Sequence, residues 1–186
     1  MSELASAHAA DAFDELPTKS AAISIDLPTA ASLDICVVVP TYRRPVMLER
    51  CLTSLLMQHY DPARFEIIVC DDGPDDATRA CVERLAREHA ASGPRVRYVP
   101  VTTTQGPAGA RNAGWRLSRA ASIAFTDDDT QPDGRWLASG VRALAAGAGA
   151  VSGRIIVPLG KRPTDYETDA AGLACAEFAT ANAFMD

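Results

Sequence analysis

Residues 35–45 read Ile-Cys-Val-Val-Val-Pro-Thr-Tyr-Arg-Arg-Pro, an apolar run followed by a polar segment between two prolines. The first five residues of this stretch are apolar and show no polar alternation, which indicates a β-strand covered on both faces. Pro40 ends this strand, and Pro45 stands where a helix can begin. Leucines then recur at spacings of three and four up to about residue 58, so the next segment is predicted to be a helix with one apolar face.

The same pattern of strand and helix recurs along the chain. Further strands are predicted at residues 65–70, 95–101, 122–126 and 149–157. A second helix is predicted to follow the turn at residues 71–74 and to end before Gly93 and Pro94. Two more helices are predicted, at 110–119 and from Pro132 to about Ala146. The buried face of the second helix is predicted to comprise Ala77, Ala80, Cys81 and Leu85. Strands that alternate with helices predict an α/β fold with a mostly parallel sheet flanked by helices.

Residues 1–32 differ in character from the rest of the chain. They are rich in alanine, serine and acidic residues and show no sustained period, which predicts a tail or linker. Residues 33–186 are predicted to form one domain, and 47% hydrophobic residues suffice for its core. The net charge of -6 argues against nucleic acid as a partner, because a phosphate-backbone binder needs a basic face.

The cysteines and the N-terminus bear on the cellular compartment. Five cysteines without C-x-x-C spacing, mostly among apolar neighbours, are typical of buried free thiols in a reducing cytoplasm. The chain begins without the basic and apolar segments of a signal peptide. No stretch approaches the ~20 apolar residues that cross a bilayer, so any membrane contact is expected to be peripheral.

Three polar clusters directly follow predicted strands, at residues 40–44, 71–73 and 127–129. The carboxyl ends of parallel strands share one edge of the sheet, and ligands bind in the crevice outside that edge. The three clusters are therefore expected to converge there.

Asp127, Asp128 and Asp129 form the most informative cluster. In extended chain, residues 127 and 129 point to one side and residue 128 to the other, so two carboxylates can reach one cation. Oxygen ligands favour Mg²⁺ or Mn²⁺, and Mg²⁺ is usually held by one or two carboxylates together with substrate phosphates. The alternative is a solvated turn in which Asp129 or Thr130 caps the following helix.

Two further loops have both a structural and a functional interpretation. Asp71-Asp72-Gly73 can form a turn for backbone reasons alone, or one carboxylate can accept a hydrogen bond from a base or ribose. Residues 105–114 join a glycine-containing loop to a helix start, where free N–H groups and the helix dipole favour an anion. Arg111 adds positive charge at this place, or it is an ordinary surface arginine.

Absent motifs disfavour other nucleotide-binding classes. The first strand is not followed by G-x-G-x-x-G, which disfavours a Rossmann dinucleotide site. The P-loop motif G-x-x-x-x-G-K-[ST] does not occur, which disfavours a P-loop nucleotide site. Residues 127–130 differ in spacing and placement from the aspartate motif of haloacid-dehalogenase-like phosphatases. A nucleotidyltransferase is disfavoured because residues 40–45 contain no glycine.

Four segments, at residues 37–45, 65–73, 109–114 and 125–129, together resemble family 2 glycosyltransferases in order and spacing. The resemblance extends from about residue 34 to the end of the chain. It implies the GT-A fold, which is Rossmann-like, and inverting transfer of a sugar from a nucleotide-diphosphate donor, with a UDP-sugar expected. It also implies Mn²⁺ or Mg²⁺ as cofactor, and the acceptor is expected to be a saccharide or a lipid-linked molecule.

The same resemblance assigns donor-binding roles to the first two clusters. It implies that Pro40, Thr41 and Tyr42 lie near the base and ribose. It implies that Asp71 or Asp72 lies at the base.

Further along the chain, the resemblance places Arg111 and Asn112 near the nucleotide. Asp127 and Asp129 match the family's D-x-D pair, with Asp129 the direct metal ligand and Asp127 nearer the ribose or a metal-bound water. Asp128 is expected to support the nucleotide-sugar site.

Thr180 and Asn182 match the segment where the family begins to line its acceptor site. The family's general base lies downstream of that segment, beyond Asp186, so the resemblance predicts a domain that is incomplete at its C-terminus. Loss of a positioned base costs about 10²- to 10⁴-fold in rate, so the chain is expected to bind donor and metal but to transfer poorly. The alternative is a non-catalytic nucleotide-sugar-binding module or a fragment without turnover. Uncovered apolar faces of an incomplete sheet are expected to favour self-association.

Overall fold

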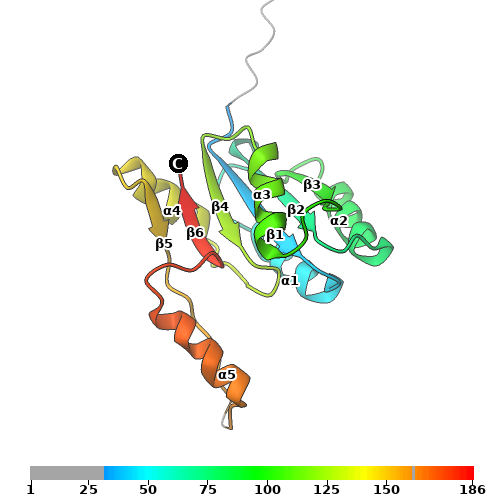
Figure 1. The fold of residues 1–186 in the computed structure, drawn as a ribbon. Coiled ribbons are helices and arrows are strands. Elements are labelled where there is room, and N and C mark those ends of the chain that lie inside the picture. The colour runs from blue at the N-terminus through cyan, green and yellow to red at the C-terminus, as the bar shows by residue number, and fades with distance from the viewer. Residues whose placement is uncertain (1–31, 161) are drawn as a thin grey trace, which may run out of the picture.

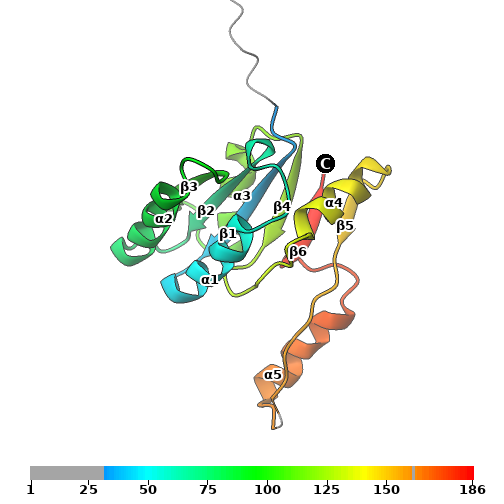
Figure 2. The same cartoon turned by 180° about the vertical axis from the view of Figure 1, so that it is seen from behind.

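The computed structural model describes residues 32–160 and 162–186. Residues 1–31 of the predicted tail lie outside the described part. Within it, the chain forms a six-stranded sheet with helices on both faces (Figures 1 and 2). The predicted α/β architecture is confirmed.

The elements follow the predicted order closely in the first two thirds of the domain. The strands are β1 (Ile35–Thr41), β2 (Phe65–Asp71), β3 (Arg95–Pro100), β4 (Ser122–Thr126), β5 (Ala150–Ser152) and β6 (Asn182–Met185). The helices are α1 (Pro45–Leu56), α2 (Asp76–Glu88), α3 (Pro107–Leu117), α4 (Trp136–Ala145) and α5 (Asp165–Ala170), with short 3-10 helices at Pro62–Arg64 and Ala171–Cys175.

The strand order is β3-β2-β1-β4-β6-β5. β1 to β4 run parallel, whereas β6 is antiparallel to both β4 and β5. From β1 the chain moves outward to β2 and β3 and then returns to place β4 on the other side of β1. Such a switch point leaves a crevice outside the carboxyl ends of the two strands that flank it, here β1 and β4.

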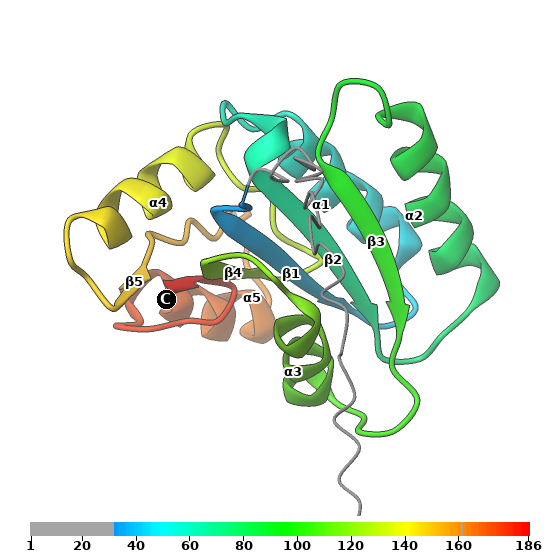
Figure 3. The same ribbon diagram turned by 90° about the horizontal axis from the view of Figure 1, so that it is seen from above.

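The sheet has two cores because helices cover both of its faces (Figure 3). On one face, Ile35, Val37 and Val39 of β1 pack with residues of α1, α2 and α4. On the other, Cys36 and Val38 pack in a smaller cluster that includes Ala110 of α3. Every residue of β1 is buried, which explains its apolar run without polar alternation.

Helix α3 approaches the sheet closely at Gly114. A Cβ atom at this position would lie 2.5 Å from Val38 Cγ1 and 2.8 Å from Cys70 Sγ. The absence of a side chain at Gly114 therefore sets the depth at which α3 packs on β1 and β2.

The C-terminal third of the sheet differs from the prediction. The predicted strand at 149–157 is wrong in length, because β5 comprises only Ala150–Ser152 and pairs with the short β6. Strand β6 was not predicted. Between β5 and β6 the chain leaves the sheet, and α5 lies away from the main body in this excursion (Figure 1).

Three helices also differ in detail. α3 begins at Pro107 rather than residue 110, and α4 begins at Trp136 rather than Pro132. In α2 the prediction of the buried face was half wrong. Ala77 and Ala80 are exposed, and the buried residues are Thr78, Cys81, Val82 and Leu85.

The cysteines are unpaired, and Cys36, Cys51, Cys70 and Cys81 are buried whereas Cys175 is exposed. Burial raises the pKa of Cys36, Cys51 and Cys70 to about 12. Among the residues that the structure describes, no helix has the length and apolar character needed to cross a membrane.

Candidate functional site

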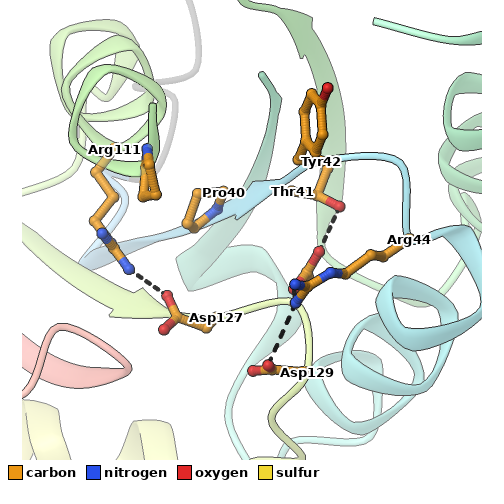
Figure 4. Close-up of a pocket in the computed structure, with 9 residues that line it drawn as sticks. Pro40, Thr41, Tyr42, Arg44, Arg111, Asp127 and Asp129 are labelled. Atoms are coloured by element: carbon orange, nitrogen blue, oxygen red, sulfur yellow. Dashed lines mark hydrogen bonds and ion pairs between the residues drawn. The ribbon is translucent and has the colours of Figure 1, made fainter. Parts of the chain in front are cut away.

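A pocket of about 190 Å³ opens at the switch point, between the carboxyl ends of β1 and β4. Figure 4 shows its lining side chains, which come from the end of β1, the start of α3 and the segment after β4. The lining residues are Pro40, Thr41, Tyr42, Arg44, Pro107, Arg111, Asp127, Asp128 and Asp129. Two of the three predicted clusters, at residues 40–44 and 127–129, therefore converge at this pocket, whereas residues 71–73 do not line it.

The three aspartates lie in a turn and not in extended chain. The backbone N–H and the hydroxyl of Thr130 both donate to the carbonyl of Asp127, at 3.2 and 2.8 Å. The prediction from strand alternation was therefore wrong about the backbone, although all three carboxylates do line one pocket. From α1, the thiol of Cys51 donates to the same carbonyl at 3.4 Å, which anchors the turn to the core.

Asp127 pairs with Arg111, and the distance between Arg111 Nη2 and Asp127 Oδ1 is 2.5 Å (Figure 4). The Arg111 side chain is 17% exposed. Within the described part of the chain, Arg111 Nε is buried and has no hydrogen-bond partner. Buried donors are nearly always satisfied, so this N–H group is an exception among the described residues.

Asp128 lies deepest in the aspartate turn. It is buried, and the hydroxyl of Thr41 donates to its Oδ2 at 2.7 Å. Burial raises the pKa of this carboxyl, and the neighbouring Asp129 and Asp127 add to the rise. Thr41 and Arg44 act in the opposite direction because they stabilise the ionised form.

Arg44 completes the charged surroundings of the turn. Its Nη1 lies 3.7 Å from Asp128 Oδ1 and 3.6 Å from Asp129 Oδ2. Neither Arg44 nor Pro107 was predicted as a site residue. The signal for Arg44 was its place in the polar cluster directly after the first strand, and the signal for Pro107 was its place at a helix start beside a glycine.

Asp71 and Asp72 hold the loops around the pocket and do not line it. Asp71 is fully buried, and its carboxylate accepts hydrogen bonds from Gly73 N, Asp75 N and Tyr98 Oη at 3.2, 3.3 and 2.8 Å. Both oxygens of Asp72 accept from Gly106 N, at 2.9 and 2.8 Å. Asp72 thereby fixes the residue before α3, and with it the start of the helix that carries Arg111.

The remaining donor-side residues lie at different depths. Tyr42 is 52% exposed, and its ring packs over Gly73, where an added Cβ would lie 2.4 Å from Tyr42 Cε2. Pro40 is buried at the floor of the pocket. Asn112 is exposed on α3 and is not part of the pocket lining.

The two residues expected on the acceptor side also lie outside this pocket. Thr180 is exposed. Asn182 begins β6, where its amide accepts from Trp136 Nε1 at 2.9 Å and donates to the carbonyl of Arg154 at 3.0 Å. The side chain of Asn182 thus joins α4 to the start of the excursion between β5 and β6.

The donor set of the pocket fits a hard divalent cation that shares its coordination with a substrate. Asp127 and Asp129 provide carboxylate oxygens at the rim, and their side chains are 33% and 48% exposed. In the described residues, no group of three Asp, Glu, His or Cys side chains forms a complete metal site. Oxygens from a bound diphosphate would complete such a site, which is the usual arrangement for Mg²⁺.

The match to a known family agrees with this geometry. The sequence model described as Glycosyl transferase family 2 matches residues 36–181, which is most of the chain. This chain belongs to glycosyl transferase family 2. The matched range contains the aspartate turn, Arg111 and all other residues of the pocket.

Two relatives of this family 2 chain are named as glycosyltransferases. Glycosyltransferase AglE of Haloferax volcanii is 29% identical over 122 residues, which are 65% of this chain and 39% of AglE. The GalNAc(5)-diNAcBac-PP-undecaprenol beta-1,3-glucosyltransferase of Campylobacter jejuni is 34% identical over 98 residues, which are 52% of this chain and 30% of that protein. The chain thus spans less than half the length of these relatives.

A solved structure shares the fold. The mannosyltransferase PcManGT of Pyrobaculum calidifontis, in complex with GDP-Man and Mn²⁺, superposes with a TM-score of 0.63 and 28% sequence identity. The match covers 83% of this chain and 44% of the mannosyltransferase. The predicted GT-A fold is confirmed.

Proposed function

We propose that this chain binds a nucleotide sugar together with Mn²⁺ or Mg²⁺ and forms the donor side of an inverting glycosyltransferase. The observation that carries the proposal is the pocket at the switch point, where three carboxylates and two guanidinium groups converge. The family match and the fold shared with a mannosyltransferase solved with GDP-Man and Mn²⁺ support it.

The charge balance of the pocket supports the need for a cation. Three ionised aspartates against Arg44 and Arg111 leave one net negative charge, counted from the pocket lining. A diphosphate is itself negative, so the pocket without a cation would repel it. A divalent cation reverses the sign of the pocket and so allows the donor to bind.

Asp127 and Asp129 are the residues that would hold the cation. When bound, it would offset the charge that develops on the departing diphosphate. Two hydrogen bonds from the rest of the chain hold the aspartate turn in place. The Thr41 hydroxyl donates to Asp128, and the Cys51 thiol donates to the carbonyl of Asp127, so the carboxylates are positioned before the donor binds.

Arg111 is the residue placed to bind the donor directly. It lies in the second turn of α3, and its Nε is the buried group without a partner among the described residues. Because Arg111 lines the pocket, a phosphate or ribose oxygen there could accept a hydrogen bond from its guanidinium group. Tyr42, half-exposed at the end of β1, is placed to pack against the base or ribose.

The proposal also covers the nucleotide of the donor, the acceptor and the residue that acts as general base. We take a UDP-sugar as the donor and a saccharide or lipid-linked molecule as the acceptor, which agrees with the PP-undecaprenol in the name of the Campylobacter relative. Inverting transfer needs a base that removes the proton of the acceptor hydroxyl. We assign this role to a carboxylate outside the pocket, because its three carboxylates contact arginine or threonine and serve the cation.

Calorimetric titration tests the donor site. UDP, GDP and dTDP are titrated with and without Mn²⁺ into the parent chain and into an Asp127→Ala, Asp129→Ala double variant. We expect one nucleotide to bind in a Mn²⁺-dependent manner to the parent and at least about tenfold more weakly to the variant. An Asp165→Ala, Asp169→Ala variant loses two exposed aspartates of α5 and should bind like the parent. Equal binding by both double variants would contradict the proposed site.

A further inference from the structure

Arg44 is the N-cap of α1, and its side chain extends toward Asp129 in the aspartate turn (Figure 4). A single nitrogen, Nη1, lies between two carboxylates, 3.7 Å from Asp128 and 3.6 Å from Asp129. Both distances exceed the roughly 2.7–2.9 Å of a charge-assisted hydrogen bond. Arg44 therefore neutralises the pair electrostatically without being bonded tightly to either member.

The two arginines of the pocket differ in how firmly they are held. Arg111 is 17% exposed and lies 2.5 Å from Asp127. Arg44 is 55% exposed, and at this exposure an ion pair is weakened by solvent and contributes little. Of the two guanidinium groups, Arg44 is thus the one that a stronger cation can displace from the carboxylates.

Asp128 and Asp129 need a positive charge in the absence of a metal. They are neighbours in one turn, and the same Arg44 nitrogen lies 3.7 Å from Asp128 and 3.6 Å from Asp129, so two like charges share this one nearby cation. A divalent cation carries twice the charge of Arg44, and Mg²⁺ approaches oxygen ligands to about 2.0–2.1 Å. It would therefore replace Arg44 at Asp129 and leave the guanidinium beside the bound diphosphate.

We propose that Arg44 is a displaceable counterion that competes with the divalent cation for the aspartate turn and then binds the diphosphate of the donor. The inference rests on the proposed function, because it needs the cation and the donor to share this pocket. It makes Arg44 a positioning residue with opposite effects on two affinities. Arg44 weakens binding of the free cation and strengthens binding of the nucleotide once the cation is present.

The experiment measures both affinities separately. Electron paramagnetic resonance of free Mn²⁺ gives the affinity for the metal alone, and calorimetry at saturating Mn²⁺ gives the affinity for the nucleoside diphosphate. For Arg44→Gln we expect Mn²⁺ to bind about fivefold more tightly, because a competing charge is gone. We expect the nucleotide to bind about fivefold more weakly, because an ionic contact to phosphate is lost. Arg44→Lys keeps the charge and should fall between the parent and Arg44→Gln in both measurements.

Arg43→Gln is the matched control, because it removes the same charge from the neighbouring residue. Arg43 lies over the Tyr42 ring, 5.2 Å from its centroid, and is not part of the pocket lining. Its Mn²⁺ affinity should stay within about twofold of the parent value. A variant that had merely lost structure would lose both affinities, so opposite changes cannot arise from misfolding.

The outcomes separate the inference from the function on which it rests. Unchanged or weaker Mn²⁺ binding by Arg44→Gln, with normal binding by the parent, would overturn the role of Arg44 alone. If the parent chain itself bound no Mn²⁺ with or without nucleotide, the proposed metal-dependent function would fail and the inference with it.

Discussion

Asp128 depends on Thr41 because a buried carboxylate needs hydrogen-bond donors. The Thr41 hydroxyl donates to it at 2.7 Å, and Arg44 remains at 3.7 Å. Burial raises the pKa of Asp128, which means that the folded chain disfavours its ionised form. The hydroxyl of Thr41 opposes this effect and fixes the side chain at the floor of the pocket.

Replacing Thr41 by valine tests this dependence, since valine has a similar shape but no hydroxyl. We expect Thr41→Val to lower the free energy of unfolding by about 1–3 kcal/mol, because a buried polar group loses its partner. Urea denaturation at pH 7 measures the change. Thr41→Ser keeps the hydroxyl and should lose clearly less. Equal stability of Thr41→Val and the parent would show that Asp128 does not rely on this bond.

Asp75 is the N-cap of α2, and its hydrogen bonds show how this element begins. Its Oδ1 accepts from Ala77 N at 2.9 Å and Thr78 N at 3.0 Å, and its Oδ2 accepts from Thr78 Oγ1 at 2.7 Å. These bonds stabilise the ionised carboxylate and lower the pKa of Asp75, with the Thr78 hydroxyl as the largest cause.

The lowered pKa of Asp75 gives a pH-dependent prediction. Because the folded-state pKa is below the unfolded value of about 3.9, the stabilisation is present above that value and is lost as the pH falls through the folded pKa. Asp75→Ala should therefore cost about 1 kcal/mol at pH 7, and this difference should shrink below pH ~3.9. Thermal or urea unfolding between pH 2.5 and 7 measures it. Asp76→Ala, which removes an exposed first-turn acid, should change stability by only about 0.3–0.5 kcal/mol. A cost that did not vary with pH would contradict the capping role of the charge.

Gly114 determines how α3 packs, and substitution tests this at the scale of the element. Gly114→Ala brings a methyl group into contact with Val38 and Cys70, so we expect stability to fall by about 1–3 kcal/mol despite the better helix propensity of alanine. Gly149→Ala is the control because its Cβ would have no neighbour within 4 Å. Denaturant titration of both variants gives the comparison. A more stable Gly114→Ala would mean that α3 can move away from the sheet without cost.

The sequence predicted the strands and helices that show a clear apolar pattern of their own. It missed the strand β6, whose conformation depends on pairing with a segment distant in the sequence. β1 was predictable because all its residues are buried and its first five, at 35–39, are apolar. β6 was not, since its four residues gain their conformation from antiparallel pairing with β4, which lies more than 50 residues earlier in the chain. The proximity of Thr41 and Asp128 was predictable because both follow or end parallel strands whose carboxyl ends share one edge of the sheet. For residues 127–129 the sequence left extended chain and a solvated turn both open, and the structure has the turn.

At the scale of the whole molecule, the pocket joins β1, α3 and the segment after β4, so a ligand there links several parts of the fold. A ligand that binds the folded state alone stabilises it by about 2.7 kcal/mol at 100 times its dissociation constant. For a domain of this size we expect the melting temperature to rise by roughly 5–10 °C with Mn²⁺ and the preferred nucleoside diphosphate. Differential scanning fluorimetry measures the shift.

Chelation and mutation provide the controls for this thermal shift. EDTA should abolish most of the rise, and the Asp127→Ala, Asp129→Ala variant should show little rise at the same concentrations. A full shift in the presence of EDTA would mean that the nucleotide binds independently of the cation.

The distribution of the cysteines makes the chain suitable for labelling with a single spectroscopic probe. Cys36, Cys51 and Cys70 are buried with pKa values of about 12, so at pH 7.5 almost none of these thiols is present as the reactive thiolate. Cys81 is buried as well, whereas Cys175 is exposed in the excursion between β5 and β6. A maleimide fluorophore will therefore attach at Cys175 in the unmodified sequence, and its emission will report on the surroundings of this excursion when donor and acceptor are added.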